Sequence, residues 1–173
     1  MIKRTIILIT IIFATLAATY ALKLLFFKPF SFNHFLTRQL VYDALESPEY
    51  LTYIGILEKY GYRSYNGKLS DYSLEKDIKD LKKLKKEYKI LNSYENEELS
   101  AEELTSKKIS LFQMRNEIDQ RTKYPYHAYP LIQMNGLHTR ILEFMTDIHP
   151  IKDEKDAKYY LSRLEMIPLV FSQ

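Results

Sequence analysis

"DAKYYLSRLEMIPLVFSQ", residues Asp156 to Gln173, is the stretch that decides how the chain is organised. Tyr160, Leu161, Leu164 and Ile167 recur at helical spacing, which predicts an amphipathic helix. The apolar run from Ile167 to Phe171 follows directly, whereas a helix that closes a soluble domain usually ends in a polar turn with a Gly or Asn cap. We therefore expect this helix to pack against a further apolar surface, as an internal helix of a longer helical fold.

The composition is that of a folded, helical protein. The chain has 173 residues, enough for one domain and a short targeting element, and its apolar and aromatic contents exclude a disordered chain. Only four Gly and six Pro favour helices over a turn-rich sheet protein. The net charge of +3, with both signs interleaved, is too weak a field to predict a nucleic-acid partner. The absence of Cys excludes disulfides, thiolate zinc sites and a cysteine nucleophile.

The N-terminus has the pattern of a membrane element. Two basic residues precede an uncharged stretch from Thr5 to Leu22, and Lys23 is followed by four more apolar residues. A spanning helix needs about 20 mainly apolar residues, so we predict membrane contact through Thr5 to Phe27. The basic start predicts that the rest of the chain lies outside the cytoplasm.

Residues 1–28 fit two kinds of targeting element. A cleaved signal peptide would use Thr19-Tyr20-Ala21 as its best cleavage site, whereas the length of the apolar stretch favours an uncleaved signal anchor. The anchor would place the protein in the inner membrane, facing the periplasm or the outside, and cleavage would make it secreted. Both alternatives predict a location in or beyond the cell envelope.

Residues 30–173 predict five or six helices and no strand. Helix-starting signals stand at Ser31, Ser47-Pro48-Glu49, Ser73, the capping box from Ser100 to Glu103, and Asp153. They predict helices over about 31–45, 47–61, 73–91, 100–121, 133–147 and from 153 onward, with a loop over 62–72 and an extended connector over 123–130. The fold class is therefore all-α: an N-terminal transmembrane or signal helix followed by an incomplete helical bundle.

The apolar positions of these helices predict the core. The first bundle helix places five large residues on one broad face: Phe32, Phe35, Leu36, Leu40 and Leu45. The basic cluster Lys82 to Lys86 flanks an apolar stripe, and the acids of the same helix, Glu87 among them, predict charge pairs on a solvated surface.

No constellation of chemistry-bearing residues stands out. The four histidines are His34, His127, His138 and His149, and none of them forms the i, i+4 pair of a helical zinc site. The paired carboxylates between Glu95 and Glu103 are neighbours in the sequence, so we expect an exposed interhelix loop and no catalytic pair. We assign no catalytic, cofactor-binding or metal-binding residue.

Small motifs in a fixed order give the chain a resemblance to a known family. They are Ser47-Pro48-Glu49, Thr52, Gly55, Asp71-Tyr72-Ser73, Leu99-Ser100, Asn135-Gly136, Asp156-Ala157, Tyr160-Leu161, Arg163-Leu164, Pro168 and Gln173. With them, residues Phe32 to Gln173 resemble the N-terminal part of bacterial domain-of-unknown-function family 885. The final stretch is similar to that family's "DAxxYLxRLxxIPxxxxQ" segment and is the most specific match.

The resemblance implies an exported, largely helical protein similar to zinc metallopeptidases of the carboxypeptidase type. It places the zinc signature H-E-x-x-G-H-H in a C-terminal half, and this sequence has no such motif. No catalytic or metal residue therefore carries over to this chain, and zinc is implied only for the intact family.

Two hypotheses follow. In the first, the chain is a truncated N-terminal fragment, inactive alone, whose partner is a separately encoded C-terminal half. In the second, it is a membrane-anchored helical interaction module without enzymatic activity.

Overall fold

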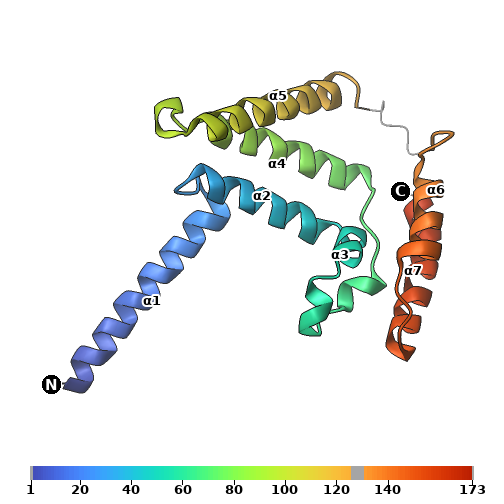
Figure 1. The fold of residues 1–173 in the computed structure, drawn as a ribbon, viewed down its shortest axis with the longest axis horizontal. Coiled ribbons are helices and arrows are strands. Elements are labelled where there is room, and N and C mark those ends of the chain that lie inside the picture. The colour runs from blue at the N-terminus through green and yellow to red at the C-terminus, as the bar shows by residue number, and fades with distance from the viewer. Residues whose placement is uncertain (1, 126–130, 173) are drawn as a thin grey trace.

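The computed structural model of the protein describes residues 2–125 and 131–172 (Figure 1). Within these two ranges the chain forms seven α-helices and no strand, so the predicted all-α class is confirmed. The helices are α1 (Ile2–Phe26), α2 (Phe32–Glu46), α3 (Pro48–Ile54), α4 (Leu74–Asn92), α5 (Ala101–Lys123), α6 (Leu137–Glu143) and α7 (Glu154–Ser172). Short 3₁₀ turns are η1 (Leu57–Tyr60), η2 (Ser64–Gly67) and η3 (Asn96–Glu98), and η4 (Phe144–Ile148) is a π-helix.

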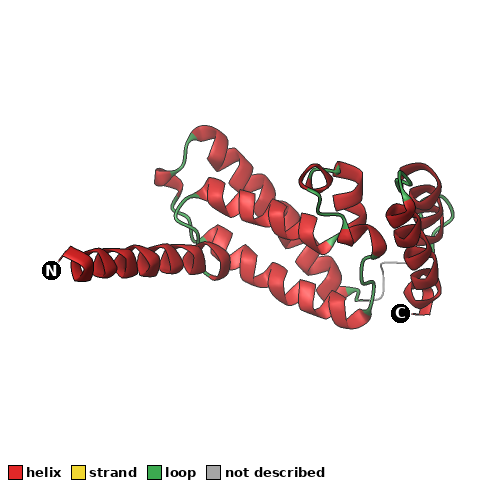
Figure 2. Ribbon diagram, turned by 90° about the horizontal axis from the view of Figure 1, so that it is seen from below, coloured by secondary structure: helices red, strands yellow, loops and turns green. Residues whose placement is uncertain are grey.

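Helix α1 extends away from the rest of the chain, as both views show (Figures 1 and 2). It covers the uncharged stretch that the sequence predicts to be helical. Over the residues that the structure describes, however, no helix combines the length and the hydropathy that a membrane crossing requires. The spanning helix predicted over Thr5 to Phe27 is therefore not supported.

Helices α2, α4 and α5 lie side by side and form one packed unit (Figures 1 and 2). Its core contains Phe32 and Phe35 of α2, Leu91 of α4, and Tyr94 from the turn before α5. The prediction that Leu40 and Leu45 share this buried face is wrong, because both are exposed in α2. The face that α2 buries is thus shorter than its apolar pattern suggests.

The predicted helix starts are confirmed by their caps. The side chains of Ser31, Ser47, Ser73 and Ser100 each accept a hydrogen bond from a backbone N–H three residues later. At Ser100 the Glu103 side chain also accepts from the backbone N–H of the cap residue, which completes the predicted capping box. These local bonds satisfy N–H groups that the first helical turn leaves without a partner.

Two predicted helices differ from their observed extent. The helix predicted over 47–61 ends as α3 at Gly55, which has φ 64, and a separate turn η1 then ends at Gly61, with φ 78. Glycine adopts this left-handed conformation without a Cβ penalty, so each of the two glycines stops a helix. The helix predicted from about 133 begins only at Leu137, because Gly136 is extended and its carbonyl accepts the first helical bonds.

The connector predicted over 123–130 is described only in part. Lys123 is still the last residue of α5, and residues 126–130 lie outside the described residues. The prediction of an extended conformation there is therefore not tested.

Helix α7 lies beside α6 in both views and against η2 (Figures 1 and 2). A second core joins them, formed by Leu69, Leu137, Ile141, Phe144, Met145 and Val170. Asp153 caps α7 as predicted, since its Oδ1 accepts the Asp156 N–H at 2.8 Å. The opposite side of α7, which we call the outer face, exposes Leu161, Leu164, Pro168 and Phe171. This second core and α7 position the site described next.

Candidate functional site

Arg163 of α7 is the centre of the C-terminal part of the chain. Its side chain is fully buried, with 0% of the residue exposed. It donates hydrogen bonds to five acceptors: the carbonyl oxygens of Pro48, Tyr65 and Lys68, the hydroxyl of Thr52, and Nδ1 of His149. The shortest of them measure 2.7 to 2.8 Å and use all three nitrogens of the guanidinium. One side chain thereby joins α7 to α3, η2 and the residue after η4.

The charge of Arg163 is balanced without an ion pair among the described residues. Its guanidinium carbon lies 4.7 Å from the centre of the Phe144 ring, a cation–π contact. Burial lowers the pKa of Arg163 to about 10, partly opposed by the negative charge of Glu49. The side chain therefore stays charged at neutral pH, stabilised by oriented dipoles and one aromatic face.

The His149 side chain accepts a hydrogen bond from Arg163. A guanidinium only donates, so the contact of 2.7 Å between Arg163 Nη1 and His149 Nδ1 requires a neutral imidazole with its proton on Nε2. The imidazole also packs edge-on against the rings of Phe144 and Tyr160. Burial lowers the pKa of His149, and the positive charge of Arg163 lowers it further.

A series of hydrogen-bonded polar side chains leads from Thr52 to the surface. The Thr52 hydroxyl donates to Oδ1 of the fully buried Asn66 at 2.8 Å, and Asn66 Nδ2 donates to Glu58 at 3.0 Å. Lys152 is the last member of this series and forms an ion pair of 2.7 Å with Glu58. Burial opposes ionisation of Glu58, but the bonds from Lys152 and Asn66 outweigh it and lower the pKa of that carboxyl.

Asp156 is the second buried polar residue of α7, with 1% of the residue exposed. Its carboxylate accepts from Arg63 Nη1 at 2.9 Å and from the Lys152 N–H at 3.2 Å. Arg63 reaches Asp153 with its other terminal nitrogen, also at 2.9 Å. The first turn of α7 is thus attached to the segment just before η2.

Gly67 allows α7 to approach η2 closely. Ser162 donates from its hydroxyl to the Gly67 carbonyl at 3.1 Å. A Cβ on Gly67 would lie 2.9 Å from Cδ1 of the Tyr159 ring, closer than real side-chain carbons come. Gly67, which falls in the loop predicted over 62–72, is therefore a contact site for α7.

The family resemblance places the zinc signature in a C-terminal half, so it assigns none of the histidines of this chain to a metal. Among the described residues, no three His, Asp or Glu side chains lie close enough together to hold a metal ion. The Nδ1 atom of His149 is occupied by Arg163, and His127 lies outside the described residues. The described residues therefore offer no site for a zinc ion, and we derive no chemistry through one.

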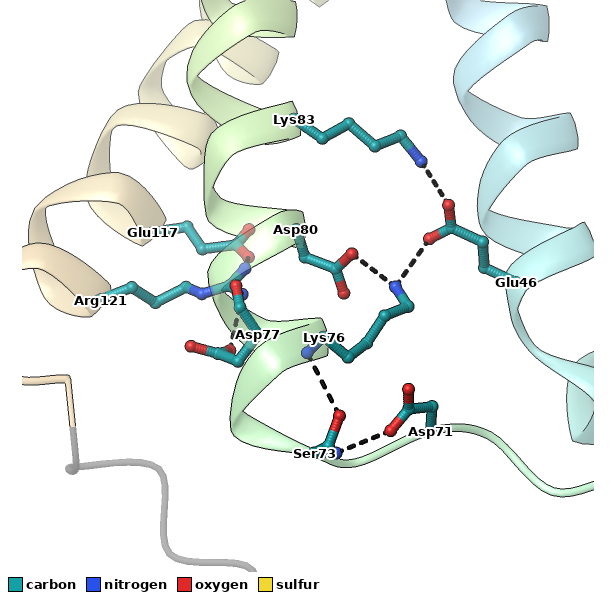
Figure 3. A network of polar contacts seen from close by, with 9 residues as sticks. All are labelled: Glu46, Asp71, Ser73, Lys76, Asp77, Asp80, Lys83, Glu117 and Arg121. Carbon is teal, nitrogen blue, oxygen red and sulfur yellow. Dashed lines mark hydrogen bonds and ion pairs between the residues drawn. The ribbon is translucent and has the colours of Figure 1, made fainter. Parts of the chain in front are cut away.

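Charged side chains of α2, α4 and α5 form a network at one end of the first unit (Figure 3). Glu46 of α2 accepts from Lys76 and Lys83 of α4, each at 3.0 Å, and Arg121 of α5 pairs with Asp77 at 2.6 Å. A groove of about 410 Å³ runs beside the network. Burial raises the pKa of Asp43 at its edge, although Lys83 opposes the shift. Lys83 of the lysine cluster is paired, but its partner is Glu46 of α2 and not, as predicted, an acid of its own helix.

The prediction that Glu87 belongs to this solvated surface is wrong. Glu87 is buried against Arg38, with 2.5 Å between Arg38 Nη2 and the carboxylate and side-chain exposures of 5% and 8%. Arg38 Nη1 also donates to the Phe27 carbonyl at 2.5 Å. This buried pair attaches the end of α1 to α2 and α4.

Both buried arginines carried a signal in the sequence that pattern reading missed. Arg38 stands three residues after Phe35, and Arg163 stands three residues after Tyr160 and four before Ile167. Each arginine therefore lies on the apolar stripe of its helix, where a charged residue is rarely found unless it is paired.

The fold and this site define an all-α protein whose last helix is held by a buried arginine and a buried aspartate. The chain belongs to the family DUF885, described as "Bacterial protein of unknown function", whose model matches residues 48–173. The match starts at the first residue of α3, later than the Phe32 that the sequence motifs predict. No curated protein and no solved structure was found to match the chain.

Proposed function

We propose that this chain is the N-terminal helical part of an exported DUF885 protein and that its own role is structural. The observation that supports this role is that the buried polar side chains of α7 bind other parts of the same chain. Arg163 and Asp156 are bonded to the chain's own backbone and side chains, so they position helices and are not presented to a substrate.

The outer face of α7 supplies the contact surface in this proposal. Leu161 is 57% exposed, and Leu164 and Phe171 follow it on the same side of the helix. Contiguous exposed apolar side chains mark interaction sites in soluble proteins. The partner that we propose is a separately encoded C-terminal half of the family, carrying the H-E-x-x-G-H-H motif and the zinc-dependent peptide hydrolysis that the resemblance implies.

Co-expression tests this proposal. The reading frames adjacent to the gene are searched for an H-E-x-x-G-H-H segment, and its product is expressed with the tagged chain. We expect the two to co-purify and zinc-dependent peptide hydrolysis to require the C-terminal half. Hydrolysis by this chain alone, or the lack of any such reading frame, would overturn the proposal.

A matched pair of variants tests the surface. Leu161→Glu places a charge on the outer face of α7 and should abolish co-purification. Ile109→Glu on α5 changes an apolar residue of nearly equal exposure, 53%, and should leave it intact. Equal effects of the two substitutions would exclude α7 as the contact surface.

The alternative role is a helical interaction module without enzymatic activity in any assembly. The way α1 extends from the rest of the chain favours it, because such a helix is available for a separate contact (Figure 1). This role predicts a monodisperse chain with a cooperative melt and no hydrolysis in any complex that it forms. Aggregation of the chain without a C-terminal half would count against it.

The location that we propose is the cell envelope. The basic start and the uncharged stretch up to Leu22 support export, by a cleaved signal or by a retained anchor. Fractionation of cells that express a C-terminally tagged chain tests this, and N-terminal sequencing of the product separates the two routes. Recovery of the chain in the cytoplasm alone would overturn it.

A further inference from the structure

A cavity of about 330 Å³ lies between the start of α3, Tyr72 and the α6–η4 segment. This volume is at the lower end of the roughly 300–1,000 Å³ of small-molecule sites, so it suits a small ligand. It is separate from the outer face of α7 and does not depend on the proposed docking role.

One wall of the cavity is apolar. Leu137, Ile141 and Phe144 are buried members of the second core, and the half-buried Ile148 packs against them. The three core residues line the cavity, although 7% or less of each is exposed. An apolar group of a ligand would extend the core at this place.

Two opposite charges of α6 line the same cavity. Arg140 and Glu143 are three residues apart, and with the described residues neither side chain makes an ion pair or a hydrogen bond. Glu49, which also lines the cavity, is already engaged, since it accepts from Ser70 N–H at 2.9 Å and from the Ser70 hydroxyl at 2.5 Å. The cavity thus offers one cation and one anion beside an apolar wall.

Tyr72 also lines the cavity. Burial raises the pKa of its hydroxyl, Glu49 raises it further, and Arg140 acts in the opposite direction. The hydroxyl is therefore protonated at neutral pH and lies within electrostatic reach of both a carboxylate and the guanidinium.

We propose that this cavity binds a small zwitterion that carries an apolar group. The ligand's carboxylate pairs with Arg140, its ammonium pairs with Glu143, and its apolar group lies on Leu137, Ile141 and Phe144. A simple anion would face two carboxylates, and a simple cation would leave Arg140 without a partner, so the zwitterion is the class that matches both charges.

Three probes with one aromatic group and different charges test the proposal by calorimetry on the full chain. L-phenylalanine has both charges, phenylpropionate lacks the ammonium, and phenylethylamine lacks the carboxylate. We expect L-phenylalanine to bind about tenfold or more tightly than either of the others, because each loses one charge-assisted hydrogen bond. Equal affinities for the three probes, or no binding of L-phenylalanine, would overturn the proposal.

Variants test which side chain binds which charged group of the ligand. Arg140→Gln should weaken L-phenylalanine binding about tenfold and leave phenylethylamine unchanged, and Glu143→Gln should weaken L-phenylalanine and leave phenylpropionate unchanged. Both residues are exposed, so circular dichroism should report unaltered folding. Arg115→Gln, an exposed arginine of α5, is the matched control and should bind like the unchanged chain. If Arg140→Gln binds L-phenylalanine as tightly as Arg115→Gln does, the assignment is wrong.

Discussion

Arg163 Nη1 lies 2.7 Å from Nδ1 of His149, and this contact joins two buried ionisable side chains of which only one is charged. The arrangement is stable because the imidazole accepts and the guanidinium donates. Protonation of His149 would place two positive charges in contact without a carboxylate in the pair. The centre of the DUF885 region is therefore sensitive both to loss of the arginine and to acid.

Removing Arg163 should strongly destabilise the chain. Arg163→Met fills much of the same space but leaves several buried acceptors without a donor, so we expect a loss of about 3 kcal/mol or more in the free energy of unfolding. Urea denaturation followed by circular dichroism measures it. Arg115→Met, at an exposed position of α5, should change the free energy by less than about 0.5 kcal/mol. Similar losses in the two variants would contradict the central role of Arg163.

Acid should weaken the fold through His149. Its pKa is lowered in the folded chain from 6.5, so between that value and its folded pKa the unfolded chain binds more protons. The contribution of the neutral His149 side chain to the free energy of unfolding is complete above pH 6.5 and is lost as the pH falls through the folded pKa. The carboxyl of Glu58, whose pKa is also lowered, loses its contribution only below about its ordinary value of 4.5, so the two windows can be separated.

The variant His149→Gln isolates this effect. A glutamine oxygen accepts from Arg163 but does not titrate, so the free energy of unfolding should depend less on pH between 6.5 and 4.5 than in the unchanged chain. Urea midpoints of the two proteins over this range measure the difference. Parallel pH profiles would show that His149 does not titrate in the folded state as inferred.

A methyl group at Gly67 should push α7 away from η2. Gly67→Ala brings its Cβ into the Tyr159 ring, and such overpacking typically costs about 1–3 kcal/mol. Thermal melts should show a lower Tm. The double variant Gly67→Ala, Tyr159→Ala removes the clash and should recover part of the loss. If the stability loss of the double variant equals the sum of the losses of the two single variants, the result would argue against this contact.

The buried pair of Arg38 and Glu87 should show strong coupling. Arg38→Met leaves a buried carboxylate without its partner and should cost about 3–5 kcal/mol. Replacing both residues by Met removes the uncompensated charge, so the double variant should be more stable than Arg38→Met alone. A double-mutant cycle by urea denaturation checks this expectation. Additive losses would mean that the two side chains do not stabilise each other.

The helix starts and the all-α class could be predicted because they depend on residues that are close in the sequence. Ser31, Ser73 and Ser100 cap helices through bonds to residues only three positions away. The helix ends were harder to predict. Gly55 stops α3 because it takes a left-handed conformation, whereas the periodic apolar pattern continued past it to Gly61.

The candidate site could not be predicted in the same way. Arg163 and Asp156 were recognised as motif residues, but their partners lie up to 115 positions away in the chain. Arg38 and Glu87 are 49 positions apart, and the charged neighbours of Glu87 in the sequence predict a surface position for it. The cavity beside Arg140 likewise depends on Tyr72 and the start of α3, which only the folded chain brings together.

The sequence is sufficient to predict the helical class, the caps and the family, because these depend on local hydrogen bonds and on an ordered set of motifs. The roles of the motif residues depend on the tertiary structure. Arg163 and Asp156 could equally have been surface charges, and it is the packing of α7 against α3 and η2 that buries them. Once buried, each polar group requires partners, and the chain supplies them from distant segments.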